Sequence, residues 1–141
     1  MLFRSQQTRF RRVPLPISAD SVQIDSIDTA DVYGNGLSEE YLGKALKGQR
    51  DDVVIATKFG AYDVPETLTG GHPEWIKKAV DNSLRRLGAD WIDLYQHHFP
   101  DAKVPVADTL GALNDLVVAG KVRHIGCSNY GDRRASCRER V

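Results

Sequence analysis

The 141-residue sequence has few cysteines, no long apolar run and no net charge, and each absence excludes a class of protein. Its two cysteines, Cys127 and Cys137, are too few for a disulfide scaffold or a four-cysteine zinc site, so a reducing, cytoplasmic setting is expected. No apolar stretch approaches the roughly 18 residues that a membrane helix needs, so no membrane association is expected. The polar, basic segment Met1–Arg12 lacks the apolar core of a signal peptide.

The zero net charge conceals an uneven distribution of 19 basic and 19 acidic residues. Residues 1–14 carry four arginines and no acid, and residues 133–141 carry four arginines and one glutamate. The body between them, residues 15–132, therefore has a net charge of −7. Basic ends are typical of nucleic-acid-binding arms, but the body is acidic and no nucleic-acid motif accompanies them, so no nucleic-acid partner is predicted.

The central part of the sequence alternates β-prone runs with helical patterns, in a composition typical of a globular domain. The β-prone runs are Val22–Ala30, Asp52–Thr57, Trp91–Gln96 and Arg123–Ser128. Helical spacing predicts helices over Glu39–Lys47, from Pro73 to the stop at Gly88, and from Val106 to the stop at Gly120. This order predicts parallel strands joined by helices, either in an open doubly wound sheet or in a closed eight-unit barrel.

Side-chain spacing also predicts which face of each helix lies inward. Ser38 is the predicted N-cap of the first helix. The predicted inward residues of that helix are Tyr41, Leu42, Ala45 and Leu46. Those of the second helix are Ile76, Ala79, Val80, Ser83, Leu84 and Leu87, and those of the third are Leu110, Leu113, Leu116 and Val117.

Two motifs of other α/β folds are incomplete in this sequence. Gly34–Glu39 (Gly-Asn-Gly-Leu-Ser-Glu) has only two of the three glycines of a dinucleotide-binding fingerprint and does not directly follow a strand. Its glycines are therefore interpreted as turn residues. Gly126–Tyr130 has a tyrosine where a nucleophile elbow requires its second glycine.

Polar residues gather at the points where the predicted strands end. They are Asp28 and Tyr33, then Lys58, then His97 or His98, and finally Ser128 and Asn129. Because the carboxyl ends of parallel strands lie at one end of the sheet, these side chains are expected to meet there. The two adjacent histidines are not expected to share a metal ion, because consecutive strand residues point to opposite faces.

A tyrosine, a lysine, an aspartate and a histidine brought together can transfer a proton. Free tyrosine has a pKa of about 10, and a neighbouring cation favours the phenolate and lowers that pKa. Lys58 could supply the cation, Asp28 could keep Lys58 charged and oriented, and a neutral imidazole could orient a carbonyl oxygen. Taken singly, Asp28 could be a turn residue, Tyr33 a loop aromatic and Lys58 a solvated lysine. Their shared position at the strand ends favours the functional interpretation.

Five segments of the sequence resemble the aldo-keto reductase family, in the family's order and spacing. They are Ile27–Gly34, Ala56–Gly60, Ser83–Gly88, Asp93–Asp101 and Gly120–Tyr130. The resemblance implies a partial (β/α)8 TIM barrel of about four parallel strand–helix units, covering roughly the second to fifth strands of the family. It also implies NADPH-dependent reduction of a small-molecule aldehyde or ketone to an alcohol.

The resemblance carries catalytic roles over to individual residues. Tyr33 matches the proton donor, Lys58 and Asp28 match its activators, and His98 matches the family histidine. His97 is interpreted as a packing residue. Within the same family, the alternative is a non-catalytic binding or regulatory subunit, but a binding role would not require the intact acid–base set.

The resemblance also implies a cofactor contact and a division of the chain. Ser128 and Asn129 match the pair that binds the nicotinamide carboxamide. Residues 24–132 form the reductase-like partial barrel, whereas residues 1–23 and 133–141 have no family counterpart. Arg134–Val141 resembles the translation of a sequencing adapter and Leu2–Ser5 the opposite adapter, so both ends are expected to be foreign. With the later cofactor-binding units absent, the chain alone is expected to be inactive.

Overall fold

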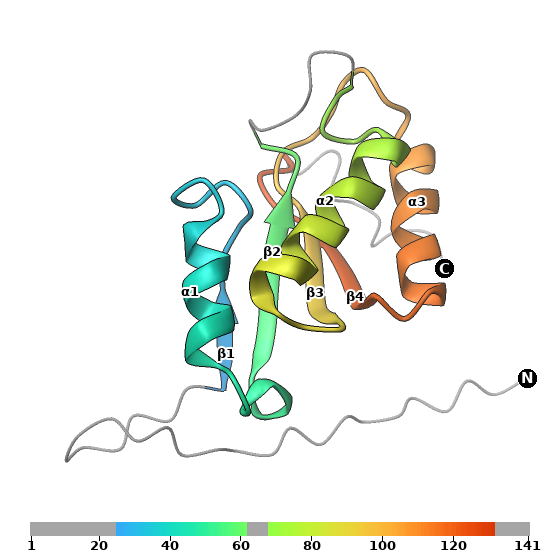
Figure 1. Cartoon of the computed structure of the whole chain (residues 1–141). Helices are drawn as coiled ribbons and strands as arrows, with labels where there is room; N and C mark the ends of the chain where they lie inside the picture. The colour runs from blue at the N-terminus through green and yellow to red at the C-terminus, as the bar shows by residue number, and fades with distance from the viewer. Residues whose placement is uncertain (1–24, 62–67, 132–141) are drawn as a thin grey trace, which may run out of the picture.

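The computed structural model describes residues 25–61 and 68–131 (Figure 1). The expectations for residues 1–23 and 133–141 lie outside these ranges. Strands and helices alternate in the predicted order: β1 (Ser26–Asp28), α1 (Leu37–Ala45), β2 (Val54–Phe59), α2 (Pro73–Leu87), β3 (Ile92–His97), α3 (Val106–Val118) and β4 (Val122–Cys127). A 3-10 turn, Arg50–Asp52, precedes β2. In the part of the chain so described, no helix is long and apolar enough to cross a membrane.

The four strands form one parallel sheet in the order β1-β2-β3-β4, and the three helices lie on one side of it (Figure 1). Each strand pairs with the strand that precedes it in the sequence, as in a barrel, whereas the order in a doubly wound sheet reverses at a switch point. The prediction of four parallel strand–helix units is therefore confirmed. The barrel is not closed within the described residues.

The core lies between the sheet and the helices. Its largest fully buried apolar side chains are Ile55, Phe59, Ile76, Val80, Ile92, Tyr95, Leu113 and Val122. Each side chain of this size contributes about 1.5–3 kcal/mol when fully buried. The second helix forms as predicted: Pro73 occupies its first turn, the side chain of His72 accepts from the Glu74 backbone N–H, and Gly88 ends it in the left-handed conformation with φ 59°.

The predicted inward face of α1 is wrong at two positions. Tyr41 is 63% exposed and Ala45 is also exposed, although Leu42 and Leu46 do pack inward. Glu39 instead lies beside the sheet and is 0% exposed. Glu39, Leu42 and Leu46 follow the spacing i, i+3, i+7 of one helix face, so a charged residue occupies a stripe that was expected to be apolar.

Two further predictions about helices are wrong. Ser38 does not cap α1, because the helix begins at Leu37, two residues earlier than predicted, with Gly36 at the N-cap position. The Ser38 hydroxyl instead forms a hydrogen bond with the Thr29 hydroxyl at 2.7 Å. Leu110 of α3 is 44% exposed. The inward position is taken by Thr109, which is buried and donates its hydroxyl hydrogen to the Gly71 carbonyl oxygen at 2.9 Å.

The helices α1 and α2 approach closely at Gly43. An added Cβ there would lie 2.6 Å from the carbonyl oxygens of both Arg86 and Leu87. Gly43→Ala is therefore expected to push the helices apart and to destabilise the chain by about 1–3 kcal/mol, measured by urea denaturation. Gly111→Ala in α3 is the matched control, because nothing lies within 4 Å of its Cβ, and it should stabilise by about 0.5–1 kcal/mol. Equal stability changes in the two variants would contradict the close approach.

Candidate active site

The ammonium group of Lys58 is held at the carboxyl ends of β1 and β2. Lys58 is buried, and its Nζ donates to the Asp28 carboxylate and to the Thr29 carbonyl oxygen at 2.9 Å. The register places Asp28 opposite Ala56, so Lys58 lies two residues beyond the end of β1. The buried ammonium thus has an opposite charge and a second oxygen partner, which offset the cost of its burial.

Tyr33 lies beside this cation on the loop between β1 and α1. The Lys58 Nζ lies 5.4 Å from the centroid of the Tyr33 ring. The tyrosine remains 44% exposed, so a ligand at this end of the sheet can reach it. Gly34, Asn35 and Gly36 follow it with φ of 60°, 56° and 88°. These three left-handed residues make a tight turn, which agrees with the interpretation of the two glycines as turn residues.

His98 faces Tyr33 from the third strand. It directly follows β3, and its backbone N–H donates to the Phe59 carbonyl oxygen at 2.9 Å. The His98 and Tyr33 rings meet edge to face with centroids 6.0 Å apart. Burial lowers the pKa of His98, and the positive charge of Lys58 lowers it further against the opposing charge of Asp28. The imidazole is therefore neutral at pH 7.

We call Asp28, Tyr33, Lys58 and His98 the strand-end tetrad. They come from β1, the loop after it, β2 and the position directly after β3, and contacts link them in the order Asp28, Lys58, Tyr33, His98. The four side chains therefore lie together at one end of the sheet, as their positions after the predicted strands led us to expect.

Ser128 and Asn129 lie next to the tetrad, directly after β4. The Ser128 backbone N–H donates to the His97 carbonyl oxygen at 2.9 Å. Asn129 has a positive φ of 57°, and its Nδ2 donates to the His98 carbonyl oxygen at 3.0 Å and to the Ser128 Oγ at 3.2 Å. The turn after β4 is thus attached to the backbone that carries His98.

His97 packs in the core, as its interpretation as a packing residue implies. It is buried and stacks on Phe59 with ring centroids 5.0 Å apart. It also makes a contact that the sequence did not reveal, because its Nδ1 lies 2.7 Å from the Tyr130 hydroxyl. Burial lowers the pKa of His97, partly opposed by the charge of Asp101. No group of three metal-ligating side chains occurs in residues 25–61 and 68–131.

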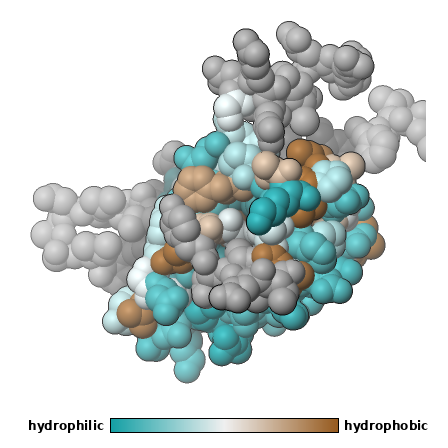
Figure 2. Space-filling view, turned by 90° about the horizontal axis from the view of Figure 1, so that it is seen from above, coloured by the Kyte–Doolittle hydropathy of each residue, from teal (hydrophilic) through white to brown (hydrophobic). Residues whose placement is uncertain are grey.

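A hollow of about 260 Å³ lies beside the tetrad, between the loops that follow β2 and β3. Phe99 lines it and stacks on His98 with ring centroids 4.6 Å apart. Asp101, also in its lining, accepts from the backbone N–H groups of Gly71 and Lys103, each at 2.8 Å. Figure 2 looks down on the molecule from the end to which the labelled strand β2 points, where hydrophilic and hydrophobic residues are mixed.

Two polar contacts near the tetrad were not predicted from the sequence. The carbonyl group of Thr29 binds Lys58, and no side-chain pattern reports the direction of a backbone carbonyl. Glu39 accepts hydrogen bonds from Thr57 and Arg86 in the layer between sheet and helices. Only its helical spacing from Leu42 and Leu46 indicates in the sequence that Glu39 is buried. An acidic residue in the first turn of a helix is also expected on the surface, because it complements the helix dipole.

Comparisons with known proteins agree with this arrangement. The model of the aldo/keto reductase family matches residues 19–136. The chain is 48% identical over 111 residues to aldo-keto reductase YhdN of Bacillus subtilis, covering 76% of this chain and 33% of that protein. It is 44% identical over 117 residues to the NADP(+) aldo-keto reductase yakc of Schizosaccharomyces pombe, covering 77% and 34%. The chain thus spans about a third of the length of these curated relatives.

Solved structures show the same similarity. The holo form of aldo-keto reductase AKR11C1 from Bacillus halodurans is 42% identical with a TM-score of 0.68, covering 75% of this chain and 37% of that one. An aldo/keto reductase from Klebsiella pneumoniae, in complex with NADP and acetate, is 34% identical with a TM-score of 0.65, covering 77% and 36%. The sheet described above is therefore a partial TIM barrel, and the chain belongs to the aldo/keto reductase family.

Proposed function

We propose that this chain carries the proton-transfer part of an NADPH-dependent carbonyl reductase, which converts an aldehyde or ketone to an alcohol. The observation that supports the proposal is the strand-end tetrad, in which a partly exposed phenol lies beside a buried ammonium and a neutral imidazole. The chain spans about a third of the length of its relatives. Turnover is therefore assigned to a complete barrel that contains this segment.

In this mechanism Tyr33 donates its hydroxyl proton to the oxygen of the carbonyl substrate. Negative charge develops on the phenol oxygen as the proton leaves. The ammonium of Lys58 stabilises that charge from its position 5.4 Å from the ring centroid. Asp28 and the Thr29 carbonyl oxygen hold Lys58 in place, so no reorganisation of the cation is needed during the reaction.

His98 orients the substrate oxygen through a hydrogen bond. Its Nδ1 is buried and finds no partner among the described residues. A hydrogen on that nitrogen would be an unsatisfied buried donor, which is costly. We therefore place the single proton of the neutral ring on Nε2, where it can be donated to a carbonyl oxygen next to Tyr33.

Ser128 and Asn129 fit a nicotinamide carboxamide. Together they offer a hydroxyl and a side-chain amide, which can donate and accept hydrogen bonds as a carboxamide does. Their turn is attached to His98, which places them beside the tetrad. NADPH bound there would supply the hydride that the carbonyl carbon requires. An aldo-keto reductase from Klebsiella pneumoniae that is 35% identical to this chain has been solved in complex with NADPH.

The alternative is a non-catalytic family member with a binding or regulatory role. The buried ammonium of Lys58 argues against it, because a binding role does not require an ammonium buried beside a tyrosine. A small carbonyl compound is the only partner that the tetrad requires. A cytoplasmic location remains a prediction from the low cysteine content.

The proposal is tested by measuring NADPH oxidation with a panel of aldehydes and ketones. A complete barrel that carries residues 25–131, with the other units taken from the Bacillus halodurans relative, is expected to turn over. The 141-residue chain alone is expected neither to bind NADPH tightly nor to reduce any substrate. A complete barrel that binds NADPH but reduces nothing would support the non-catalytic alternative. Micromolar NADPH binding with turnover by the 141-residue chain would contradict the need for further units.

A further inference from the structure

Glu39 is a fully buried carboxylate that the proposed mechanism does not use. Its Oε1 accepts from the Thr57 hydroxyl at 2.7 Å, and its Oε2 accepts from the Arg86 Nε at 2.6 Å. The side chain of Glu39 is 0% exposed and that of Arg86 is 17% exposed. One side chain of α1 thus joins β2 to the last turn of α2.

Stability alone does not explain this ion pair. Removing two charges from water is costly, and apolar side chains of the same volume often stabilise a core as well or better. What a buried ion pair adds is directional bonding, because each carboxylate oxygen here has one defined donor. These bonds fix the relative positions of α1, β2 and α2.

The first consequence of the geometry concerns Lys58. Thr57 is the residue before Lys58 in β2, and consecutive strand residues point to opposite faces. Glu39 therefore holds the strand from the helix side at the point where Lys58 leaves it on the other side. A shift of Thr57 would move the Lys58 ammonium by a comparable amount.

The second consequence concerns the loop that carries Tyr33. Ser38, next to Glu39, bonds the Thr29 hydroxyl at 2.7 Å, and the Thr29 carbonyl oxygen binds Lys58. At the end of the loop, a Cβ on Gly36 would lie 2.7 Å from Cδ of Arg86, so the arginine packs directly on the loop backbone. Ser38 thus ties the start of α1 to Thr29, which holds Lys58, and Gly36 packs on Arg86, the partner of Glu39, with Tyr33 between these contacts.

We propose that Glu39 is a positioning residue for the strand-end tetrad: with Arg86 and Thr57 it holds the β1–α1 loop so that Tyr33 stays beside Lys58 and against His98. This role rests on the proposed function, because the tetrad is its object. Glu39 itself touches neither a substrate nor a cofactor in this scheme.

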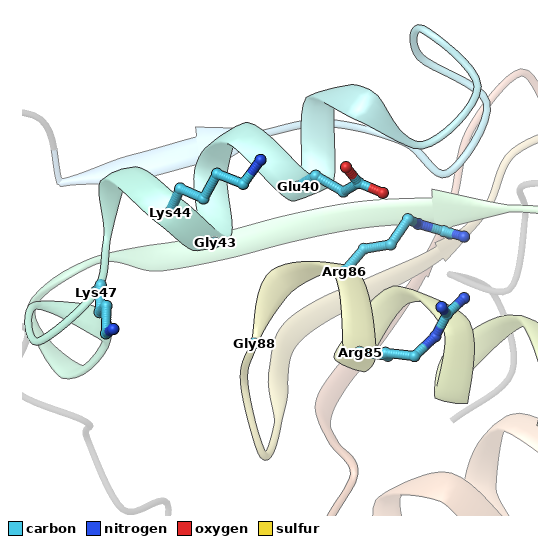
Figure 3. A pocket seen from close by; sticks show the side chains of 7 residues that line it. All are labelled: Glu40, Gly43, Lys44, Lys47, Arg85, Arg86 and Gly88. Atoms are coloured by element: carbon cyan, nitrogen blue, oxygen red, sulfur yellow. The ribbon is translucent and has the colours of Figure 1, made fainter.

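We assign no ligand to the adjacent groove between α1 and α2, because helix ends account for its cations. It measures about 330 Å³ and is lined by the cations Lys44, Lys47, Arg85 and Arg86, with Glu40 (Figure 3). Lys44, Arg85 and Arg86 lie in the last turns of their helices, where a positive charge complements the helix dipole. Arg86 is already paired with Glu39.

The test is the imidazole titration of His98 in the 141-residue chain, followed by NMR and assigned with His98→Asn. The charged and aromatic groups that face His98 are Lys58, Asp28, His97 and the rings of Tyr33 and Phe99. Burial and Lys58 hold its pKa below the ordinary value. In Glu39→Gln, release of the loop should admit water and move Lys58 away, and both changes shift the midpoint upward. Thr57→Val, which removes one bond and keeps the volume, should give a smaller shift in the same direction.

Two controls separate positioning from general destabilisation. Leu113→Ala creates a cavity in the core away from the loop and should leave the His98 midpoint unchanged. Asp81→Asn removes the exposed ion pair with Lys121 and should also leave it unchanged. An unshifted midpoint in both Glu39→Gln and Thr57→Val, or an equal shift in Leu113→Ala, would overturn the inference. Turnover is not needed for this result, so a failure of the proposed function would appear separately in the reduction assay.

Discussion

Tyr33→Phe is expected to lower kcat for aldehyde reduction by about 10²–10⁴-fold, measured in the complete barrel that carries residues 25–131. The change removes the hydroxyl that donates the proton and leaves the ring beside Lys58 and His98. Because the cofactor contacts are assigned to Ser128 and Asn129, NADPH affinity measured by fluorescence titration should not change. The loss therefore belongs to the chemical step and not to cofactor binding.

Tyr41→Phe provides the matched control for this variant. Tyr41 lies in α1, is 63% exposed, and contacts Lys44 at 5.7 Å from its ring centroid, so it too is a tyrosine beside a lysine. The same deletion of a hydroxyl there should leave kcat unchanged. Full activity in Tyr33→Phe, or equal losses in the two variants, would show that another group supplies the proton.

Asp93→Ala is expected to have the largest effect on stability. Asp93 is buried in β3, and its Oδ2 accepts from Arg50 at 2.7 Å and from the Ile55 backbone N–H at 3.0 Å. Its Oδ1 accepts from Arg123 at 2.9 Å and from the Trp91 indole at 3.3 Å. Removing the carboxylate leaves the largely buried Arg50 guanidinium without its counter-charge, which costs about 3–5 kcal/mol in urea denaturation.

Asp81→Asn is the comparison for Asp93→Ala, because it breaks an ion pair whose two side chains are both exposed. Surface pairs of this kind contribute about 0–1 kcal/mol, so its denaturation curve should nearly match that of the unmodified chain. A similar small loss in Asp93→Ala would mean that the four donors find other partners when the carboxylate is absent.

The same carboxylate should make stability depend on pH. Burial raises the pKa of Asp93, but the hydrogen bonds from Ile55 and Arg50 and the charges of Arg50 and Arg123 outweigh it and hold the pKa below its ordinary value. This contribution is present above the unfolded pKa of about 3.9 and is lost as the pH falls through the folded pKa. Asp93→Asn should therefore lose less stability than the unmodified chain between pH 7 and pH 3. Parallel losses in the two proteins would contradict this assignment.

Much of the fold followed from local patterns in the sequence. The second helix was predicted because Pro73 and Gly88 act through their own backbone geometry, whatever surrounds them. The strands were recognisable as short apolar runs, and their alternation with helices required parallel pairing. The predictions for Tyr41, Ser38 and Leu110 were wrong because helical spacing locates the buried face and the start of a helix only to within one or two residues. Contacts with other elements decide which residues at the margin of that face are buried.

The sequence by itself placed Asp28, Tyr33, Lys58 and one of the two adjacent histidines at the same end of the sheet. Each follows a predicted strand, and parallel strands bring their carboxyl ends to one side. The family resemblance selected His98 over His97. Only the tertiary structure decided which acidic residues are buried. Glu39 is buried by Arg86, 47 residues away, and Asp93 by Arg50, 43 residues away. A carboxylate can leave water only where such a distant partner meets it, and no local pattern reports that meeting.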